Sequence, residues 1–146
     1  WVETQGNYEF FRRPAWKETI SLRTNTGQAS ALQARRFVEM TDKDGKVYLG
    51  VNIENASFGA TNCAERTAFF KAVFDGHREF TAIAVVGGKD GVITGSFPPC
   101  GVCRQVMSEF CGDDFMIYMG DAEGYHALSM AEILPAGFKA AEHMKL

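Results

Sequence analysis

The chain has 146 residues, of which 46% are hydrophobic and 23% are charged. These values are typical of a single globular domain with a buried core, and they argue against a disordered chain. The net charge of −3, without a long run of Lys or Arg, disfavours a nucleic-acid partner, and no apolar stretch approaches the roughly 20 residues that a membrane span requires.

The first 34 residues differ in character from the rest of the chain. They are polar, with scattered aromatic residues and no sustained helical or strand period. A short helix is predicted only over residues 28–36. We therefore predict an atypical N-terminal segment over residues 1–34 and a folded domain over residues 35–146.

Strands and helices are predicted to alternate in the next part of the chain. Two extended runs, Phe37–Thr41 and Lys46–Ile53, flank an Asp-Gly dipeptide that is a strong hairpin signal. Cys63–Asp75 is predicted to be a helix, because Ala and aromatic residues recur at helical spacing and Gly76 follows. Thr81–Val86 is almost continuously apolar, as expected of a strand buried on both faces.

The second half of the domain repeats this alternation. Gly87–Pro99 is rich in Gly and Pro and is predicted to be a loop. A helix is predicted over Gly101–Phe110, and strands over Phe115–Met119 and Tyr125–Leu128, with a short helix near Met130–Leu134. The order of these elements predicts an α/β fold with a central sheet that carries helices.

Three cysteines and one glutamate form the most informative pattern. Cys63-Ala64-Glu65 and, further on, Pro99-Cys100-Gly101-Val102-Cys103 supply three thiolates and a carboxylate. A structural zinc site uses four protein ligands, whereas a catalytic site uses three and leaves the fourth position to water. A carboxylate beside that open position can control the water as a nucleophile. The pattern therefore predicts zinc-assisted chemistry. Cysteines with this metal-like spacing are also expected to be reduced thiols in a cytosol-like compartment.

The predicted helices explain why these cysteines suit a metal. Cys63 and Cys100 each fall at the start of a helix, where free backbone N–H groups and the helix dipole favour anions and lower a thiol pKa. Arg66 and Arg104 are candidates to donate hydrogen bonds to the sulfurs. The alternative for both arginines is an ordinary surface ion pair.

A closed site of four cysteines, including Cys111, is the main alternative. Cys103 and Cys111 are eight residues apart in one predicted helix, which separates them by about 12 Å along its axis. Two ligands of one zinc lie within a few Å of each other, so only a broken helix would bring these two together. We interpret Cys111 as a buried apolar residue. The three histidines lack ligand spacing: His77, His126 and His143.

Three ordered blocks carry a family resemblance: Asn52–Phe58 (NIENASF), Cys63–Ala68 (CAERTA) and Pro99–Met107 (PCGVCRQVM). Together they closely resemble the small homotetrameric cytidine deaminases of free nucleosides, which have three cysteine ligands. The resemblance runs from about Asp44 to Ile133–Phe138 (ILPAGF), which is similar to the closing motif of that family. It implies a three-layer α/β/α fold with a central mixed sheet of about five strands.

The resemblance also implies a reaction. Cys63, Cys100 and Cys103 would bind one Zn²⁺ per chain, with hydroxide as the fourth ligand. Glu65 would take the proton from the water, deliver it to N3 of the pyrimidine and later help to protonate the leaving ammonia, while the hydroxide attacks C4. The implied products are uridine and deoxyuridine, from cytidine and deoxycytidine, in pyrimidine salvage in the cytoplasm.

Further residues are assigned by the same resemblance. Asn52 and Glu54 match residues that hold the ribose hydroxyls, and the backbone of Ala64 matches the group that fixes the pyrimidine carbonyl edge. Phe138 matches an aromatic residue that a neighbouring subunit lends to the base, which implies a homotetramer with shared active sites. Arg66, Arg104 and Gln105 fall around the ligands. Without the resemblance, Asn52 would be interpreted as a turn residue and Phe138 as core packing.

The chain departs from the family pattern before the first hairpin. The family usually carries Tyr-Ser-x-Phe-x-Val-Gly there, and its Phe stacks on the base, but a count back from Gly45 without gaps places this Phe at Ala34. The loss of a stacking aromatic would cost about 1–3 kcal/mol of affinity. Arg35, Arg36 and Glu39, in a strand expected to be central, would each need a partner or solvent.

Other functions stay open at this point. A relative could act on another aminopyrimidine nucleoside such as blasticidin, although Asn52-Ile53-Glu54-Asn55 favours an ordinary ribonucleoside. A catalytically impaired zinc-binding paralogue would follow from the divergent N-terminus, although the intact Glu65 argues against it. Nucleic-acid editing deaminases typically use His as the first ligand, and this chain has Cys63 there.

Overall fold

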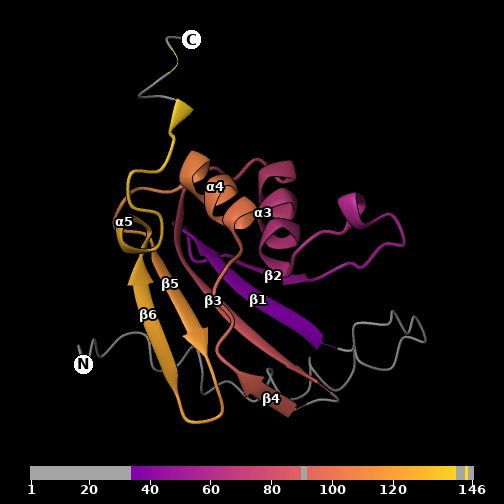
Figure 1. Cartoon of the computed structure of the whole chain (residues 1–146). Helices are drawn as coiled ribbons and strands as arrows, with labels where there is room; N and C mark the ends of the chain where they lie inside the picture. Colours follow the sequence, from indigo (N-terminus) through magenta and orange to yellow (C-terminus); the bar gives the residue numbers. More distant parts are fainter. Residues whose placement is uncertain (1–33, 90–91, 141–143, 145–146) are drawn as a thin grey trace.

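A computed structural model describes residues 34–89, 92–140 and 144 of the chain (Figure 1). In this part, one mixed sheet has the strand order β2-β1-β3-β5-β6, and β4 pairs with β3. The β3–β5 pair is parallel and the other pairs are antiparallel. The α/β fold class and the central mixed sheet are confirmed. The strands are β1 (Ala34–Asp42), β2 (Val47–Val51), β3 (Phe80–Lys89), β4 (Val92–Gly95), β5 (Met116–Gly120) and β6 (Tyr125–Ser129).

Two helices lie side by side on one face of the sheet, α3 (Ala64–Phe74) and α4 (Gly101–Phe110) (Figure 1). A short helix α5 (Met130–Ile133) contacts α4 and β6, and a 3₁₀ turn η1 (Phe58–Ala60) precedes α3. These bounds agree with the predicted helices to within one or two residues. Among the described residues, α3, α4 and α5 all contribute to one core cluster, and the second helical layer implied by the resemblance is not among them.

The core lies between the sheet and these helices. Alternate residues of β1, β3 and β5 face the helices, as the two-residue period of a strand requires. Phe69 of α3 is fully buried at the centre, with its ring centroid 5.0 Å from that of Phe80 and 6.1 Å from that of Phe110. The sheet residues of this core are Val38, Met40, Ile83, Val85, Ile117 and Met119.

The first turn of α3 lies against β2 at a glycine. A Cβ atom at Gly50 would lie 2.1 Å from the carbonyl oxygen of Ala64 and 2.9 Å from the backbone nitrogen of Ala68. Only glycine permits this approach, because backbone atoms cannot rotate away. The contact fixes the height at which α3 begins above the sheet.

The predicted loop Gly87–Pro99 is wrong in part. Strand β3 continues to Lys89, and Val92–Gly95 forms β4 beside it. Glycines weaken a strand signal, but here Gly87 has a packing role: a Cβ atom on it would lie 2.2 Å from Cδ2 of Phe97. The missing side chain makes room for an aromatic ring over the sheet.

The predicted short helix over residues 28–36 is wrong where the structure describes it. Ala34–Arg36 belong to β1, which pairs with β3 along its whole length, and this pairing overrides a weak local helical preference. Residues 28–33 lie outside the described residues, as does nearly all of the predicted N-terminal segment. Within the described ranges, no helix combines the length and the apolar character that crossing a membrane requires.

Candidate metal centre

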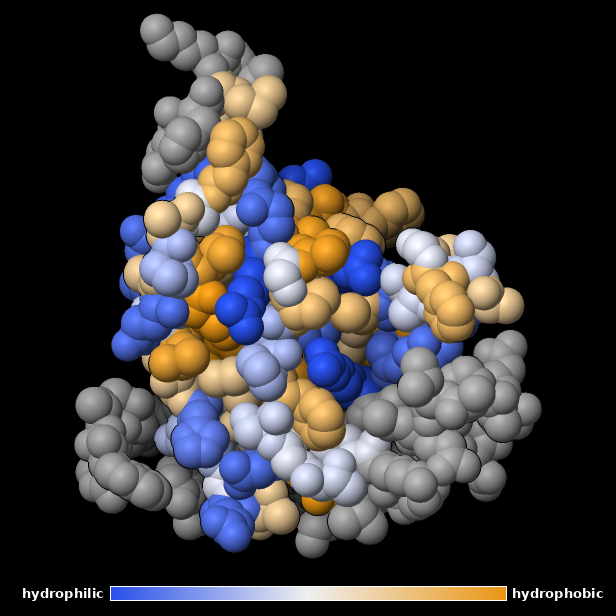
Figure 2. Space-filling view, viewed as in Figure 1, coloured by the Kyte–Doolittle hydropathy of each residue, from blue (hydrophilic) through white to orange (hydrophobic). Residues whose placement is uncertain are grey.

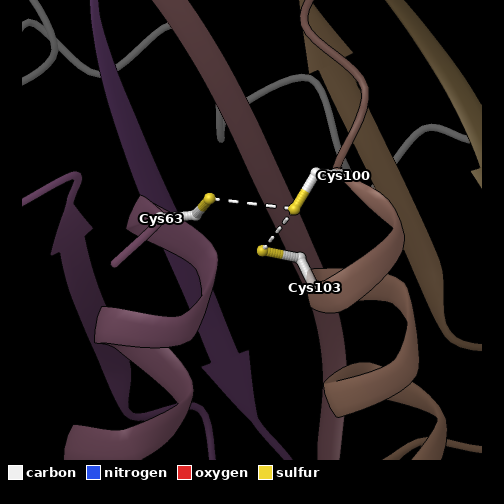
Figure 3. Close-up of side chains that lie close together, drawn as sticks. All are labelled: Cys63, Cys100 and Cys103. Carbon is white, nitrogen blue, oxygen red and sulfur yellow. Dashed lines mark hydrogen bonds between the residues drawn. The ribbon is translucent and has the colours of Figure 1, made fainter. Parts of the chain in front are cut away.

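The starts of α3 and α4 bring three thiols together. Cys63 is the N-cap residue of α3, Cys100 is the N-cap residue of α4, and Cys103 lies in the first turn of α4. The Sγ atoms of Cys63 and Cys100 are 3.8 Å apart, and those of Cys100 and Cys103 are 3.5 Å apart. Figure 3 shows the three side chains pointing toward one another, and all three sulfurs lie within 4.8 Å of each other.

This spacing fits a single zinc ion. Zn–S bonds of about 2.3 Å in a tetrahedral arrangement place two sulfurs about 3.8 Å apart, close to the distances found. A disulfide, by contrast, would need an S–S bond of about 2.05 Å, and the cysteines are free. Cys111, the C-cap residue of α4, is buried and is not in this group of sulfurs. The group therefore offers three ligands, as a catalytic zinc requires.

The pKa values of two neighbouring thiols move in opposite directions. Burial raises the pKa of the Cys103 thiol, and the negative charge of Glu65 raises it further. Burial also opposes ionisation of Cys100, but the pKa of this thiol is nevertheless lowered, because the backbone N–H of Cys103, the thiols of Cys103 and Cys63 and the backbone N–H of Val102 donate hydrogen bonds to it. One thiolate is thus stabilised by the start of α4, whereas ionising all three thiols calls for a cation among them.

Glu65, in the first turn of α3, has a completely buried side chain. Among the described residues, neither of its carboxylate oxygens has a hydrogen-bond partner. Burial raises the pKa of Glu65, and the proximity of its own backbone N–H and the positive charge of Arg36, whose Nη1 atom lies 3.9 Å from Oε1, oppose this rise. A buried carboxylate without hydrogen bonds is costly, so this group is a candidate for proton transfer to a bound ligand.

The two arginines near the cysteines have different contacts. Arg66 donates from Nη2 to the Cys63 sulfur at 3.7 Å and to the carbonyl of Thr61 at 3.1 Å. Arg104 donates from Nε to the carbonyl of Pro99 at 2.8 Å and from Nη1 to that of Ile133 at 2.9 Å. Arg66 therefore contacts a candidate ligand directly, whereas Arg104 fixes the backbone just before Cys100.

The side chains assigned to the substrate follow two different elements, β2 and α5. Asn52, just after β2, donates from Nδ2 to Glu54 Oε1 at 2.7 Å, and its Oδ1 accepts the backbone N–H of Arg36 at 2.9 Å. Phe138 lies after α5, and its side chain is half exposed. Gln105 of α4 donates to the backbone carbonyl of Phe138 at 2.9 Å. These hydrogen bonds form two separate groups. One joins Asn52 to Glu54 and to the backbone of β1, and the other joins Gln105 of α4 to the backbone of Phe138.

The structure adds two residues that the sequence did not assign to the site, Arg36 and Phe97. The Arg36 guanidinium lies over the Phe97 ring, with its Cζ atom 5.3 Å from the ring centroid, and it also faces Glu65. An arginine in a strand expected to be central was the only signal in the sequence. The histidines do not join the thiols: His77 pairs with Asp42, His126 pairs with Asp121, and His143 lies outside the described residues.

Comparisons with known proteins agree on one family. The family model described as "Cytidine and deoxycytidylate deaminase zinc-binding region" matches residues 37–119. A cytidine deaminase of Halalkalibacterium halodurans is 50% identical over 101 residues, which are 68% of this chain and 74% of that protein. A probable cytidine deaminase of Dictyostelium discoideum is 43% identical over 95 residues, 64% of this chain and 61% of that protein.

Solved structures give the same result. The crystal structure of a cytidine deaminase from Burkholderia pseudomallei has a TM-score of 0.71 and 37% identity, over 85% of this chain and 97% of that chain. A cytidine deaminase from Mycobacterium tuberculosis has a TM-score of 0.65 and 26% identity, over 84% of this chain and 93% of that chain. The sheet and helices that carry the three thiols are therefore shared with these proteins.

Proposed function

The chain belongs to the cytidine and deoxycytidylate deaminase family of zinc-dependent hydrolytic enzymes, and from this premise we propose that it converts cytidine and deoxycytidine to uridine and deoxyuridine. One observation carries the proposal: a fully buried carboxylate, Glu65, beside three convergent thiols. A structural zinc site has no use for such a group. The pyrimidine loses its amine as ammonia, and water supplies the new carbonyl oxygen.

Glu65 moves the protons of this reaction. Cys63, Cys100 and Cys103 would hold the zinc, which would supply a Lewis acid for the activation of water. Glu65 accepts the proton of the attacking water, delivers it to N3 of the pyrimidine and then helps to protonate the leaving amine. Its unpartnered oxygens support this role, because they are available to the water and the base in turn. Arg66 donates a hydrogen bond to the Cys63 sulfur.

Substrate recognition is assigned to polar groups around this centre. Asn52 and Glu54 hold the ribose hydroxyls, and their mutual hydrogen bond keeps them together. The backbone N–H of Ala64 fixes the pyrimidine carbonyl, since the first N–H groups of a helix lack partners within that helix. Phe138 covers the base in a neighbouring subunit, and Gln105 anchors the backbone that carries it.

A homotetramer with shared active sites follows from this assignment of Phe138. Its half-exposed ring has the apolar surface that a subunit contact would bury, and other large apolar side chains are exposed as well. Figure 2 shows hydrophobic patches between hydrophilic residues on the viewed face. The most exposed of these large apolar residues are Phe58, Phe74 and Val102.

Four free cysteines favour a reducing compartment such as the cytoplasm. Pyrimidine salvage would use the enzyme there.

Metal analysis combined with a cytidine assay tests the proposal. We expect about one zinc per chain in the wild type and in Glu65→Gln, and loss of cytidine absorbance only with the wild type. Glu123→Gln removes an exposed carboxylate and serves as the matched control that keeps full activity. A folded, zinc-loaded wild type that deaminates no pyrimidine nucleoside would overturn the enzyme assignment. Turnover of blasticidin in preference to cytidine would redirect the assignment to another aminopyrimidine nucleoside.

A further inference from the structure

Arg36 occupies a central strand of the sheet. It lies on β1 between β2 and β3, directly opposite Gly87 of β3. Side chains alternate along a strand, so Arg36 shares its face with Val38 and Met40, which pack in the core beneath the helices. A charged side chain on this face needs a partner or solvent. Arg36 has both, because its side chain is 30% exposed and faces Glu65.

Two contacts define where the guanidinium lies. Its Nη1 atom is 3.9 Å from Glu65 Oε1, and its Cζ atom is 5.3 Å from the centre of the Phe97 ring. Phe97 can lie there because Gly87 has no side chain. A guanidinium over an aromatic face gains cation–π attraction and loses freedom to move. Phe97 therefore restricts the group that faces Glu65.

The backbone of Arg36 is fixed as well. Its N–H donates to Asn52 Oδ1 at 2.9 Å, and its carbonyl accepts from the N–H of Asn52 at 3.4 Å. The same residue thus joins Asn52, on one side of the site, to Glu65, on the other. Among the described residues, Arg36 forms the one ion pair of Glu65.

We propose that Arg36 is a positioning residue for Glu65. This inference rests on the proposed function, because it concerns the carboxylate assigned to proton transfer. Glu65 must face the water and then N3 of the base, and Arg36 is the cation that pairs with its carboxylate among the described residues. The planar guanidinium, which lies over the Phe97 ring, orients the carboxylate through its positive charge. Misplacing a catalytic group by about 1 Å can cost about 100-fold in rate.

Steady-state kinetics of Arg36→Met test this role. Met keeps an unbranched stem in the strand and leaves the backbone bonds to Asn52 in place. We expect kcat for cytidine to fall at least about tenfold and KM to change less than about threefold, with zinc content unchanged. Arg36→Lys keeps the charge without the planar fork and should recover part of kcat. Arg78→Met is the matched control, because Arg78 is exposed and, within the described part of the chain, donates to the carbonyls of Val73 and His77.

A second measurement needs no turnover. Glu65→Gln should bind cytidine without converting it, so calorimetry can measure its dissociation constant with and without Arg36→Met. A positioning role predicts values within about threefold of each other. A large loss of cytidine affinity, an unchanged kcat in Arg36→Met, or a faster Arg36→Met enzyme would each overturn the inference. If Arg36→Met does not fold, Arg36→Lys decides, and wild-type kcat in that variant would refute the need for a planar fork. An inactive wild type would instead refute the proposed function.

Discussion

The glycine beneath the first turn of α3 gives the sharpest prediction about how the fold builds the site. A Cβ atom at Gly50 would lie 2.1 Å from the Ala64 carbonyl oxygen, and real Cβ atoms essentially never approach closer than 3.0 Å. In Gly50→Ala, β2 and α3 must therefore separate by about 0.9 Å, the difference between these two distances. The displaced turn carries Glu65 and follows directly on Cys63.

The cost of this displacement can be estimated in two ways. Overpacking a core by one methyl group typically costs about 1–3 kcal/mol of folding free energy, from a total of about 5–15 kcal/mol. A shift of about 1 Å at a catalytic group costs up to about 100-fold in rate. We therefore expect Gly50→Ala to remain folded, to lose about 1–3 kcal/mol, and to lose at least about tenfold in kcat/KM for cytidine.

Urea unfolding of the zinc-loaded protein and cytidine kinetics measure the two effects separately. Gly59→Ala is the matched control, because a Cβ atom at Gly59 meets nothing within 4 Å, and it should change neither quantity appreciably. Gly50→Ala with wild-type stability and activity would refute the reasoning. Loss of stability with full activity would show that α3 moves without disturbing Glu65.

Two further predictions concern the core and the metal. Phe69→Ala should cost about 3–5 kcal/mol of unfolding free energy, because this ring is completely buried. Phe70→Ala, at a half-exposed position on the same helix, should cost less than about 1 kcal/mol. Equal losses of unfolding free energy in urea would contradict the packing. Cys103→Ser should bind less than about one zinc per chain and lose activity. Chelation of zinc from the wild type should lower its melting temperature. Wild-type zinc content and activity in Cys103→Ser would contradict the three-thiol site.

Local signals were sufficient to predict α3, α4 and α5. The helix α3 begins after Cys63 and ends before Gly76, which has a φ of +93°, and both ends could be predicted because they depend on residues next to each other in sequence. The last residues of β3 could not be predicted, since Gly87 and Gly88 weaken the strand signal there. The Phe97 ring packs against Gly87, and this contact exists only once the hairpin has formed.

The candidate site divides in the same way. The three convergent cysteines were predictable because their type, their spacing and the carboxylate beside Cys63 are chemically specific, although Cys63 and Cys100 are 37 residues apart. The contact between Arg36 and Glu65 was not predictable. It depends on how α3 packs across β1, and without that packing an arginine in a central strand reads only as a departure from the family pattern.

The balance of buried charges explains why an arginine lies beside Glu65. With zinc bound, three thiolates and the Glu65 carboxylate would place four negative charges in one largely buried volume. The divalent ion offsets two of them, and buried anions left without compensation are strongly destabilising. Arg66, at the Cys63 sulfur, and Arg36, beside Glu65, supply the other two positive charges. Removing Arg36 would therefore leave the Glu65 carboxylate without the cation that pairs with it among the described residues.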